Sequence, residues 1–288
     1  MSSAPEYRPD ITHEISTETL EVIAQPLTGF ARLYDNGAFR KTVLLVLLAV
    51  IWEVYARLLA SPLLFPTFSA TVAALGTGLA SGELPRAATY TLSLLIKGYV
   101  AGLAIAALLT AFASATRLGA DLLETLTAMF NPLPSIALLP LALIWFGLGD
   151  GSVIFVLVHA VLWAVALNTF SGFKSLSPTL RMVGQNYGLS KLSYIAKILI
   201  PGAFPSILTG LKVGWAFAWR TLIAAELVFG VSSGSGGLGW YVFENKNQLL
   251  IPEVFAGLLT VIAFGLIVEN LIFKSIEART IKRWGMTS

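Results

Sequence analysis

Residues 180–201 read LRMVGQNYGLSKLSYIAKILIP and form a polar, basic interruption in a chain that is otherwise strongly apolar. Val183 and Tyr187 stand four residues apart. After a break, the apolar residues of 192–199 return with the same helical spacing. The stretch therefore predicts two short helices rather than one continuous helix.

The junction between the two predicted helices contains Gly188, Leu189 and Ser190. Glycine favours the left-handed conformation that ends a helix, and serine is a good N-cap for the next one. Pro201 then ends the second helix and can open a third, because the first turn of a helix needs no N–H from that residue. We expect two short helices at an angle, lying at a membrane surface just before an apolar segment.

The composition excludes a soluble globular domain. Hydrophobic residues make up 56% of the 288 residues, charged residues only 12%, and the mean hydropathy is +0.78, whereas an ordinary domain carries about 25% charged residues. The absence of Cys removes disulfides and thiolate metal sites, and His13 and His159 are too few for a histidine metal cluster. We predict a polytopic helical membrane protein without a metal site.

Six stretches are long and apolar enough to span a bilayer, which takes ~20 residues. They cover residues 42–60, 87–112, 123–147, 152–173, 202–230 and 253–275. Residues 66–80 are too short and too rich in small residues, and we expect a helix lying at the outer surface there. The predicted fold class is an all-α bundle of about six transmembrane helices over 42–275.

The remaining segments are predicted to be cytoplasmic. They are an N-terminal extension at 1–41, which lacks a secretory signal, the loop at 174–200 and a tail at 276–288. Positive charge gathers on the cytoplasmic side of membrane proteins. With both termini inside, the cytoplasmic Lys and Arg residues are Arg8, Arg32, Arg40, Lys41, Arg117, Lys174, Arg181, Lys191, Lys197, Lys274, Arg279, Lys282 and Arg283, against Arg57, Arg86 and Lys246 outside. This asymmetry predicts the orientation.

The interruption resembles the cytoplasmic coupling motif of ABC importer permeases. That pattern is roughly E-A-A, three residues, Gly, nine residues and Ile-x-Leu-Pro. Gly188 is followed after nine residues by Ile-Leu-Ile-Pro at 198–201, with Ile in place of Leu. Residues 182–184 are Met-Val-Gly where the family has E-A-A, so the ion pair of the family's Glu is not expected here.

Two further stretches resemble the sulfonate, taurine and nitrate branch of this family. One is NPLPSIALLPLALIWFG at 131–147, where prolines free backbone carbonyls and kink the predicted third span. The other is AWRTLIAAELVFG at 218–230, which is followed by a glycine-rich turn at 234–239. Together with the coupling motif, the resemblance covers roughly residues 85–275 in the family order.

The resemblance implies a type I ABC importer permease, a non-catalytic subunit in the bacterial cytoplasmic (inner) membrane. Two copies of the chain would form the pathway, and an external substrate-binding protein would deliver a small anion such as a sulfonate, taurine or nitrate. Two cytoplasmic ATPase subunits would bind ATP and Mg²⁺, so this chain is expected to hold no cofactor. The implied ATPase-coupling residues are Tyr187, Gly188, Leu189, Ser190, Lys191 and Pro201. The alternative for this stretch is a generic amphipathic helix between two spans.

Ionisable residues at membrane depth are costly and usually paired or functional. At ~1.5 Å per residue, Glu53 and Lys97 fall at similar depths near the midplane, and Lys212 and Glu269 fall together nearer the cytoplasm. We predict two structural pairs between helices. The GxxxG spacings of the second and fifth spans indicate ordinary close packing of helices.

Five residues are candidates for lining the pathway: His159, Trp163, Asn168, Arg220 and Glu226. Arg220 could offer a forked donor to an oxyanion, or it could snorkel or pair with Glu226. His159 and Trp163 share one face of the fourth span. Helix packing is the alternative role for the residues of that span.

Other classes of protein fit the sequence less well. No phosphate-loop motif, nucleic-acid motif or catalytic cluster is present, which disfavours a membrane-embedded enzyme. The main alternative is an ion-coupled secondary transporter or channel, a class that often shows internal repeats and broken helices. No repeat is evident, although the proline-rich third span could be a broken helix.

Overall fold

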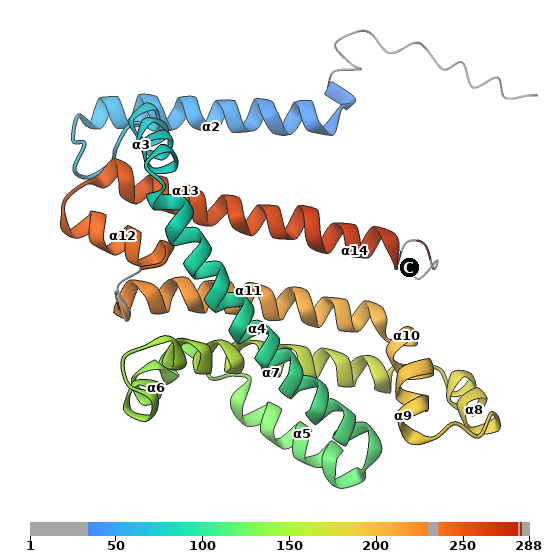
Figure 1. Cartoon of the computed structure of the whole chain (residues 1–288). Coiled ribbons are helices and arrows are strands. Elements are labelled where there is room, and N and C mark those ends of the chain that lie inside the picture. The colour runs from blue at the N-terminus through green and yellow to red at the C-terminus, as the bar shows by residue number, and fades with distance from the viewer. Residues whose placement is uncertain (1–33, 230–235, 282, 284–288) are drawn as a thin grey trace, which may run out of the picture. The chain divides into compact units, whose positions relative to one another are not determined.

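A computed structural model of the chain describes residues 34–229, 236–281 and 283, and within these ranges it is helical and has no strand (Figure 1). The chain divides into two units, residues 1–51 and 52–288. In the first unit, the described residues carry most of α2 (Gly37–Leu59), which begins before the span predicted at 42–60. Most of the predicted N-terminal extension lies outside the described residues.

The second unit contains the end of α2 and all later elements. In chain order these are α3 (Phe68–Ala80), α4 (Glu83–Ala115), α5 (Arg117–Phe130), η1 (Ser135–Leu138), α6 (Leu139–Phe146), α7 (Asp150–Lys174), α8 (Pro178–Asn186), α9 (Lys191–Tyr194), η2 (Ile195–Leu199), α10 (Ile200–Gly202), α11 (Phe204–Phe229), α12 (Leu238–Asn247), α13 (Ile251–Ile267), η3 (Val268–Phe273) and α14 (Lys274–Arg279).

The spans agree with the predicted all-α fold. Four runs, α2, α4, α7 and Ile251–Arg279, are long and apolar enough to cross a membrane on their own. Two bent pairs bring the number to six if each pair counts as one span. The pair α5 with Ser135–Phe146 is bent by 88°, and the pair Ile195–Gly202 with Phe204–Val228 by 71°. The helix predicted at 66–80 is present as α3.

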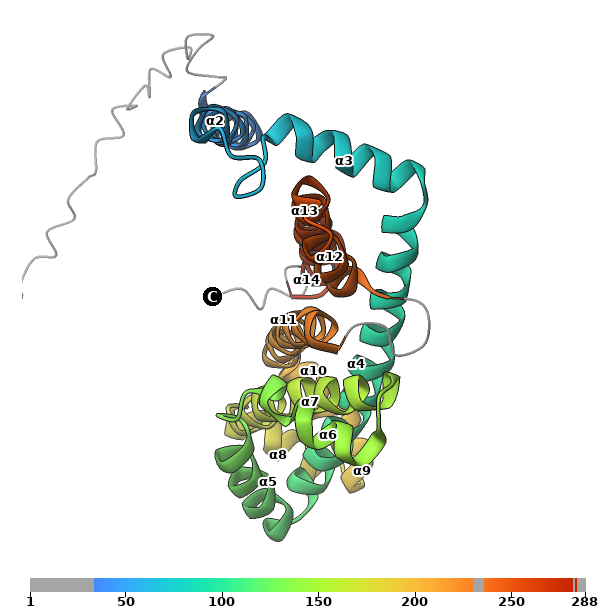
Figure 2. The same ribbon diagram turned by 90° about the vertical axis from the view of Figure 1, so that its left-hand side faces the viewer.

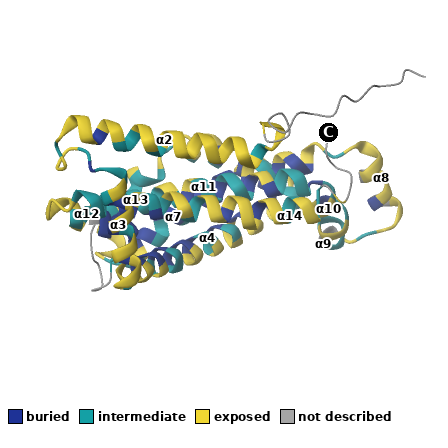
Figure 3. Cartoon of the chain, turned by 90° about the horizontal axis from the view of Figure 1, so that it is seen from above, coloured by how far each residue is buried: buried dark blue, intermediate teal, exposed yellow. Residues whose placement is uncertain are grey.

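Helix α7 forms the centre of the second unit. Every residue from Ala160 to Ala166 is buried, and a helix that is apolar and buried on all sides must be surrounded by other helices. Its neighbours are α4 and α11. Figures 1 and 2 show α4 running obliquely along the edge of α12, α11 and α7. Figure 3 shows the buried residues within this group and exposed residues along α2 and α8.

Glycines allow α4 to cross α7 closely. A Cβ at Gly98 would lie 2.5 Å from the Cβ of Leu157, and one at Gly102 would lie 2.7 Å from the Cβ of Val161. On the other side of α7, a Cβ at Gly210 would lie 2.9 Å from the Cβ of Asn168. Both predicted GxxxG spacings therefore serve close helix packing.

Helix α12 was not predicted from the sequence. Leu238, Tyr241 and Val242 are buried, and they repeat at the i, i+3, i+4 spacing of one helical face. This periodicity was the available signal, but the glycine-rich run in front of it favours a turn. Of the turn predicted at 234–239, residues 234 and 235 lie outside the described residues, and residues 238 and 239 begin α12 instead.

We predict that Gly98→Ala destabilises the chain, because the added methyl group has no room between α4 and α7. Overpacking of this kind costs about 1–3 kcal/mol. Thermal unfolding of the detergent-purified chain measures the effect. Gly76→Ala is the matched control, since nothing lies within 4 Å of a Cβ at that helical position. Equal unfolding temperatures for the two variants would contradict the crossing described above.

Candidate functional site

The third predicted span is interrupted at residues 131–134, so residues 123–147 form a broken helix, the alternative that the sequence left open, rather than one continuous kinked helix. Helix α5 stops before these residues, and η1 and α6 continue at an angle of 88°. Two of the four residues are proline and have no N–H. The other two donate backbone hydrogen bonds to α5 carbonyls at 3.0 and 3.1 Å. The break therefore leaves none of its own backbone donors unpaired.

A cavity of about 360 Å³, here called the first cavity, lies at this break. Its walls come from the break itself with η1, from α7 and from α11. The lining residues are Asn131, Pro132, Leu133, Pro134, Ser135, Ile136, His159, Ala160, Trp163, Phe217, Arg220, Thr221 and Ala224. Non-helical backbone at membrane depth is tolerated where it lines such a cavity, so the break and the first cavity belong together.

The α7 wall of the first cavity is aromatic and carries ring nitrogens without partners. His159 Nδ1 lies 3.1 Å from Ser135 Oγ, which joins α7 to η1. His159 Nε2 and Trp163 Nε1 are buried and have no hydrogen-bond partner within the described chain. The Trp163 ring stacks on Phe130 at 5.4 Å between centroids. An indole N–H can only donate, so the described residues leave one buried donor unsatisfied beside this wall.

Arg220 is the cation of the first cavity. It lines the α11 wall, its side chain is exposed, and it forms no hydrogen bond or ion pair with any described residue. The guanidinium presents five donors in a planar fork that matches an oxyanion. The first cavity thus combines an unpaired cation with an apolar, aromatic wall.

Three of the five predicted pathway residues line the first cavity, and Asn168 and Glu226 do not. The Asn168 amide donates to the Ala164 carbonyl of its own helix at 2.8 Å, and its side chain packs beside Gly210. The alternative pairing of Arg220 with Glu226 is also absent. The two residues are six positions apart on α11, so they point in different directions from the helix.

Glu226 is buried and binds the start of α12. One of its oxygens accepts the N–H of Gly239 at 2.8 Å, and both accept the Thr91 hydroxyl, at 2.9 and 3.0 Å. Thr91 in turn accepts the N–H of Leu238 at 2.8 Å. A Cβ at Gly237 would lie 2.1 Å from a Glu226 oxygen, so only glycine fits there. These bonds join α4, α11 and α12 at one buried point.

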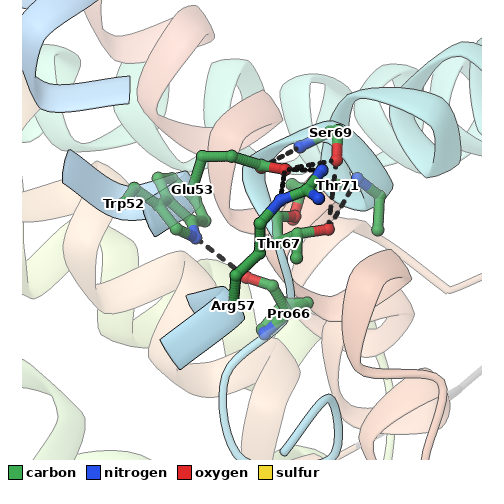
Figure 4. A network of polar contacts seen from close by, with 8 residues as sticks. Trp52, Glu53, Arg57, Pro66, Thr67, Ser69 and Thr71 are labelled. Atoms are coloured by element: carbon green, nitrogen blue, oxygen red, sulfur yellow. Dashed lines mark hydrogen bonds and ion pairs between the residues drawn. The ribbon is translucent and has the colours of Figure 1, made fainter. Parts of the chain in front are cut away.

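The two predicted charge pairs are wrong, because Glu53, Lys97 and Lys212 each have another partner. Glu53 accepts hydrogen bonds from the N–H and hydroxyl of Ser69, at the first turn of α3, and pairs with Arg57 at 2.7 Å (Figure 4). Lys97 lies 3.7 Å from Asp150. The prediction paired Glu53 with a lysine of another span at equal depth. It did not consider the backbone N–H groups at the start of α3, which also attract a carboxylate.

Lys212 also pairs differently from the prediction. It reaches the last helix, but at Glu277 (2.7 Å) in α14 rather than at Glu269. Glu277 lies two turns beyond the predicted partner. The prediction had the correct helix and the wrong register, since equal depth was assumed for helices that do not run parallel.

Residues 180–201 form the predicted short helices. Gly188 has φ +60, which is the left-handed conformation expected after α8. The Ser190 hydroxyl accepts the N–H of Ser193 at 3.4 Å, as an N-cap does. A Cβ at Gly184 would lie 2.5 Å from the Tyr194 ring, so this close contact holds α8 against α9. Tyr187 is 80% exposed.

Pro201 lies in the first turn of a third helical segment, α10, as predicted, but the direction of the chain does not change at this residue. The chain continues through η2, a π-helical turn, and then through α10, which contains the proline in its first turn. The 71° change of direction comes after Gly202. Prolines and π-helical turns are both common where a helix bends. The side chain of Lys191 lies outside the described part, and the coupling role of 187–191 and Pro201 stays a prediction.

Comparison with known proteins gives one family. Residues 98–284 match the family described as "Binding-protein-dependent transport system inner membrane component". A putative ABC transporter permease protein of Methanocaldococcus jannaschii is 30% identical over 235 residues, which are 80% of this chain and 86% of that protein. The taurine transport system permease protein of Escherichia coli K12 is 35% identical over 145 residues (50% and 51%). The nitrate import permease protein of Synechocystis is 32% identical over 152 residues (53% and 54%).

We predict that Glu226→Ala destabilises the chain, because it leaves the Gly239 N–H and the Thr91 hydroxyl buried without an acceptor. Each such group costs about 1–3 kcal/mol. Thermal unfolding in detergent provides the measurement. The unfolding temperature of Glu226→Gln, which keeps one acceptor oxygen, should lie between those of the unmodified chain and of Glu226→Ala. Glu244→Ala removes an exposed carboxylate from α12 itself and should change the unfolding free energy by no more than about 0.5 kcal/mol. A neutral Glu226→Ala variant would refute this role.

Proposed function

The chain belongs to the family of binding-protein-dependent transport system inner membrane components and is the permease subunit of an ABC importer. We propose that it carries a small anion through the first cavity. The observation that supports the anion is Arg220, a cation that lines this cavity and has no partner in the described chain. An unpaired cation at membrane depth is costly unless it serves a solute or reaches water. A bound oxyanion would supply the missing charge.

The rest of the wall suits an anion with an apolar part. An oxyanion placed between α7 and α11 would accept from the Arg220 fork, while the Trp163 ring, which lines the cavity and stacks on Phe130, provides apolar surface. A sulfonate such as taurine has both parts, and nitrate has the planar oxyanion alone. The relatives named for taurine and nitrate agree with this class of solute.

The proposed assembly contains two copies of this chain, two cytoplasmic ATPase subunits that hold ATP and Mg²⁺, and an external substrate-binding protein. The chain lies in the bacterial inner membrane with both termini in the cytoplasm, because that orientation puts most Lys and Arg residues inside. Residues 187–191 and Pro201 receive the ATPase. Closure of the ATPases would move α8 and α9, and the packed helices behind them would tilt as rigid bodies to alternate access to the first cavity.

An ion-coupled secondary transporter is the competing function, because a broken helix that lines a cavity is typical of that class as well. The energy source distinguishes the two. Purification of the tagged chain from native membranes should recover a phosphate-loop ATPase in stoichiometric amount, and uptake should require ATP. Recovery of the chain alone, still active in ion-driven uptake, would reject the importer assembly.

We predict that Arg220→Gln lowers uptake of labelled taurine or nitrate by the reconstituted importer about tenfold or more, because charge-assisted hydrogen bonds contribute about 1.5–3 kcal/mol. Arg220→Lys should recover part of the rate, since it keeps the charge and loses the fork. Lys246→Gln, at an exposed position of α12, is the control for a lost positive charge. Unchanged uptake by Arg220→Gln would reject the proposed binding residue.

We predict that Gly188→Val uncouples ATP hydrolysis from uptake while the complex still assembles. A β-branched residue is strained at φ +60, so the angle between α8 and α9 must change. ATPase activity and uptake are measured on the same proteoliposomes. Gly188→Asn is the matched control, because asparagine tolerates the left-handed conformation and should keep coupling. Normal uptake by the valine variant would sink the coupling role of this bend.

A further inference from the structure

A second cavity of about 300 Å³ lies beside the first. The two cavities share Asn131 and Pro132, the first two residues of the break. The remaining walls of the second cavity come from α5 and from the last turns of α7, including Leu167 and Phe170. The break in the third span therefore lies between the first and second cavities and lines both of them.

The second cavity also has polar groups that the protein does not fully use. Thr127 lines it, is only 6% exposed, and its hydroxyl has no hydrogen-bond partner among the described residues. Glu124 lines it too and forms an ion pair with Lys174 at the end of α7. The Lys174 ammonium lies over the Phe170 ring, 4.7 Å from its centre. The Lys174 ammonium thus contacts two residues that line this cavity, the carboxylate of Glu124 and the ring of Phe170.

We propose that the second cavity is the exit site for the anion, and that the ion pair Glu124–Lys174 closes it toward the cytoplasm. This inference rests on the proposed function of the first cavity. An anion that passes the break at Asn131 enters the second cavity and then displaces Glu124 from Lys174. The cation changes partner, and the anion leaves along α7.

The exposure of the ion pair makes this exchange feasible. The Lys174 and Glu124 side chains are 58% and 54% exposed, so water screens their attraction and the pair is weak. An anion can replace Glu124 without leaving a buried charge alone. By contrast, separating a buried ion pair would leave an unpaired charge inside the protein at a high cost in free energy, so the second cavity would stay closed. The contact with Phe170 keeps the ammonium in place during the exchange.

The chain has no Cys, so a single introduced thiol reports the second cavity directly. Ala128→Cys places it on the exposed α5 wall of this cavity. The assembled transporter is labelled in inside-out membrane vesicles with two reagents of similar size, the anionic sulfonatoethyl methanethiosulfonate and the cationic trimethylammonioethyl methanethiosulfonate. The measured quantity is the ratio of the anionic to the cationic labelling rate.

Lys174→Gln should lower this ratio by about three- to tenfold, the effect expected of one partly screened charge nearby. Glu124→Gln should raise it, because the carboxylate no longer competes for Lys174. Lys212→Gln is the matched control: Lys212 also forms an ion pair with a glutamate of another helix, yet it lines neither cavity, and its loss should leave the ratio unchanged.

Two outcomes would overturn the exit site: a thiol that neither reagent modifies from the cytoplasmic face, or a ratio that Lys174→Gln does not change. If the Ala128→Cys variant is missing from the membrane, Leu167→Cys on the opposite wall replaces it. The labelling needs no transported solute, so it is independent of the Arg220 uptake assay. If Arg220→Gln has normal uptake and the labelling ratio changes as expected, the proposed function of the first cavity is rejected and the exit site is supported. If Arg220→Gln loses uptake and the labelling ratio does not respond to Lys174→Gln, only the exit site is rejected.

Discussion

The arrangement of this protein depends on the need of every backbone N–H to find an acceptor where no water is at hand. Continuous helices meet this need by themselves. The break at residues 131–134 meets it differently, since two prolines have no N–H to satisfy and the two other residues donate to the end of α5. The chain can therefore interrupt a span without an unpaired donor. The interruption turns α6 away from α5 and leaves space for both cavities.

The interrupted span is useful only because its surroundings are rigid. Helix α7 is buried on all sides between α4 and α11, and glycines on both neighbours allow contact too close for any side chain. Interiors packed in this way shift between discrete arrangements rather than deform gradually. Buried polar bonds from Glu226 and Thr91 fix α12 to the same group of helices. The cavities thus lie between rigid parts, as alternating access requires.

The charged residues fall into two kinds according to their burial. Glu226 has all its bonds inside the protein, and Glu53 binds the first turn of α3; both hold helices in place. Arg220 has no partner in the described chain, and the Lys174–Glu124 pair is exposed and weak. The second kind lines or borders the cavities. The structural charges are buried or hold helix ends, whereas the charges proposed for transport are exposed.

The sequence by itself determined the membrane class, the apolar stretches of spanning length, the short helix at 66–80 and the bend at Gly188, because each depends on local composition, periodicity or backbone preference. It also selected His159, Trp163 and Arg220, which the structure brings to one cavity. Only the tertiary structure decided the partners of Glu53, Lys97, Lys212 and Glu226, the depth of the break and the presence of α12. Those features depend on how helices cross and where they start in space. Counting residues from the membrane surface assumes straight, parallel helices. Two of these spans are bent, by 71° and 88°, and the start of α12 is bound by Glu226 of another helix.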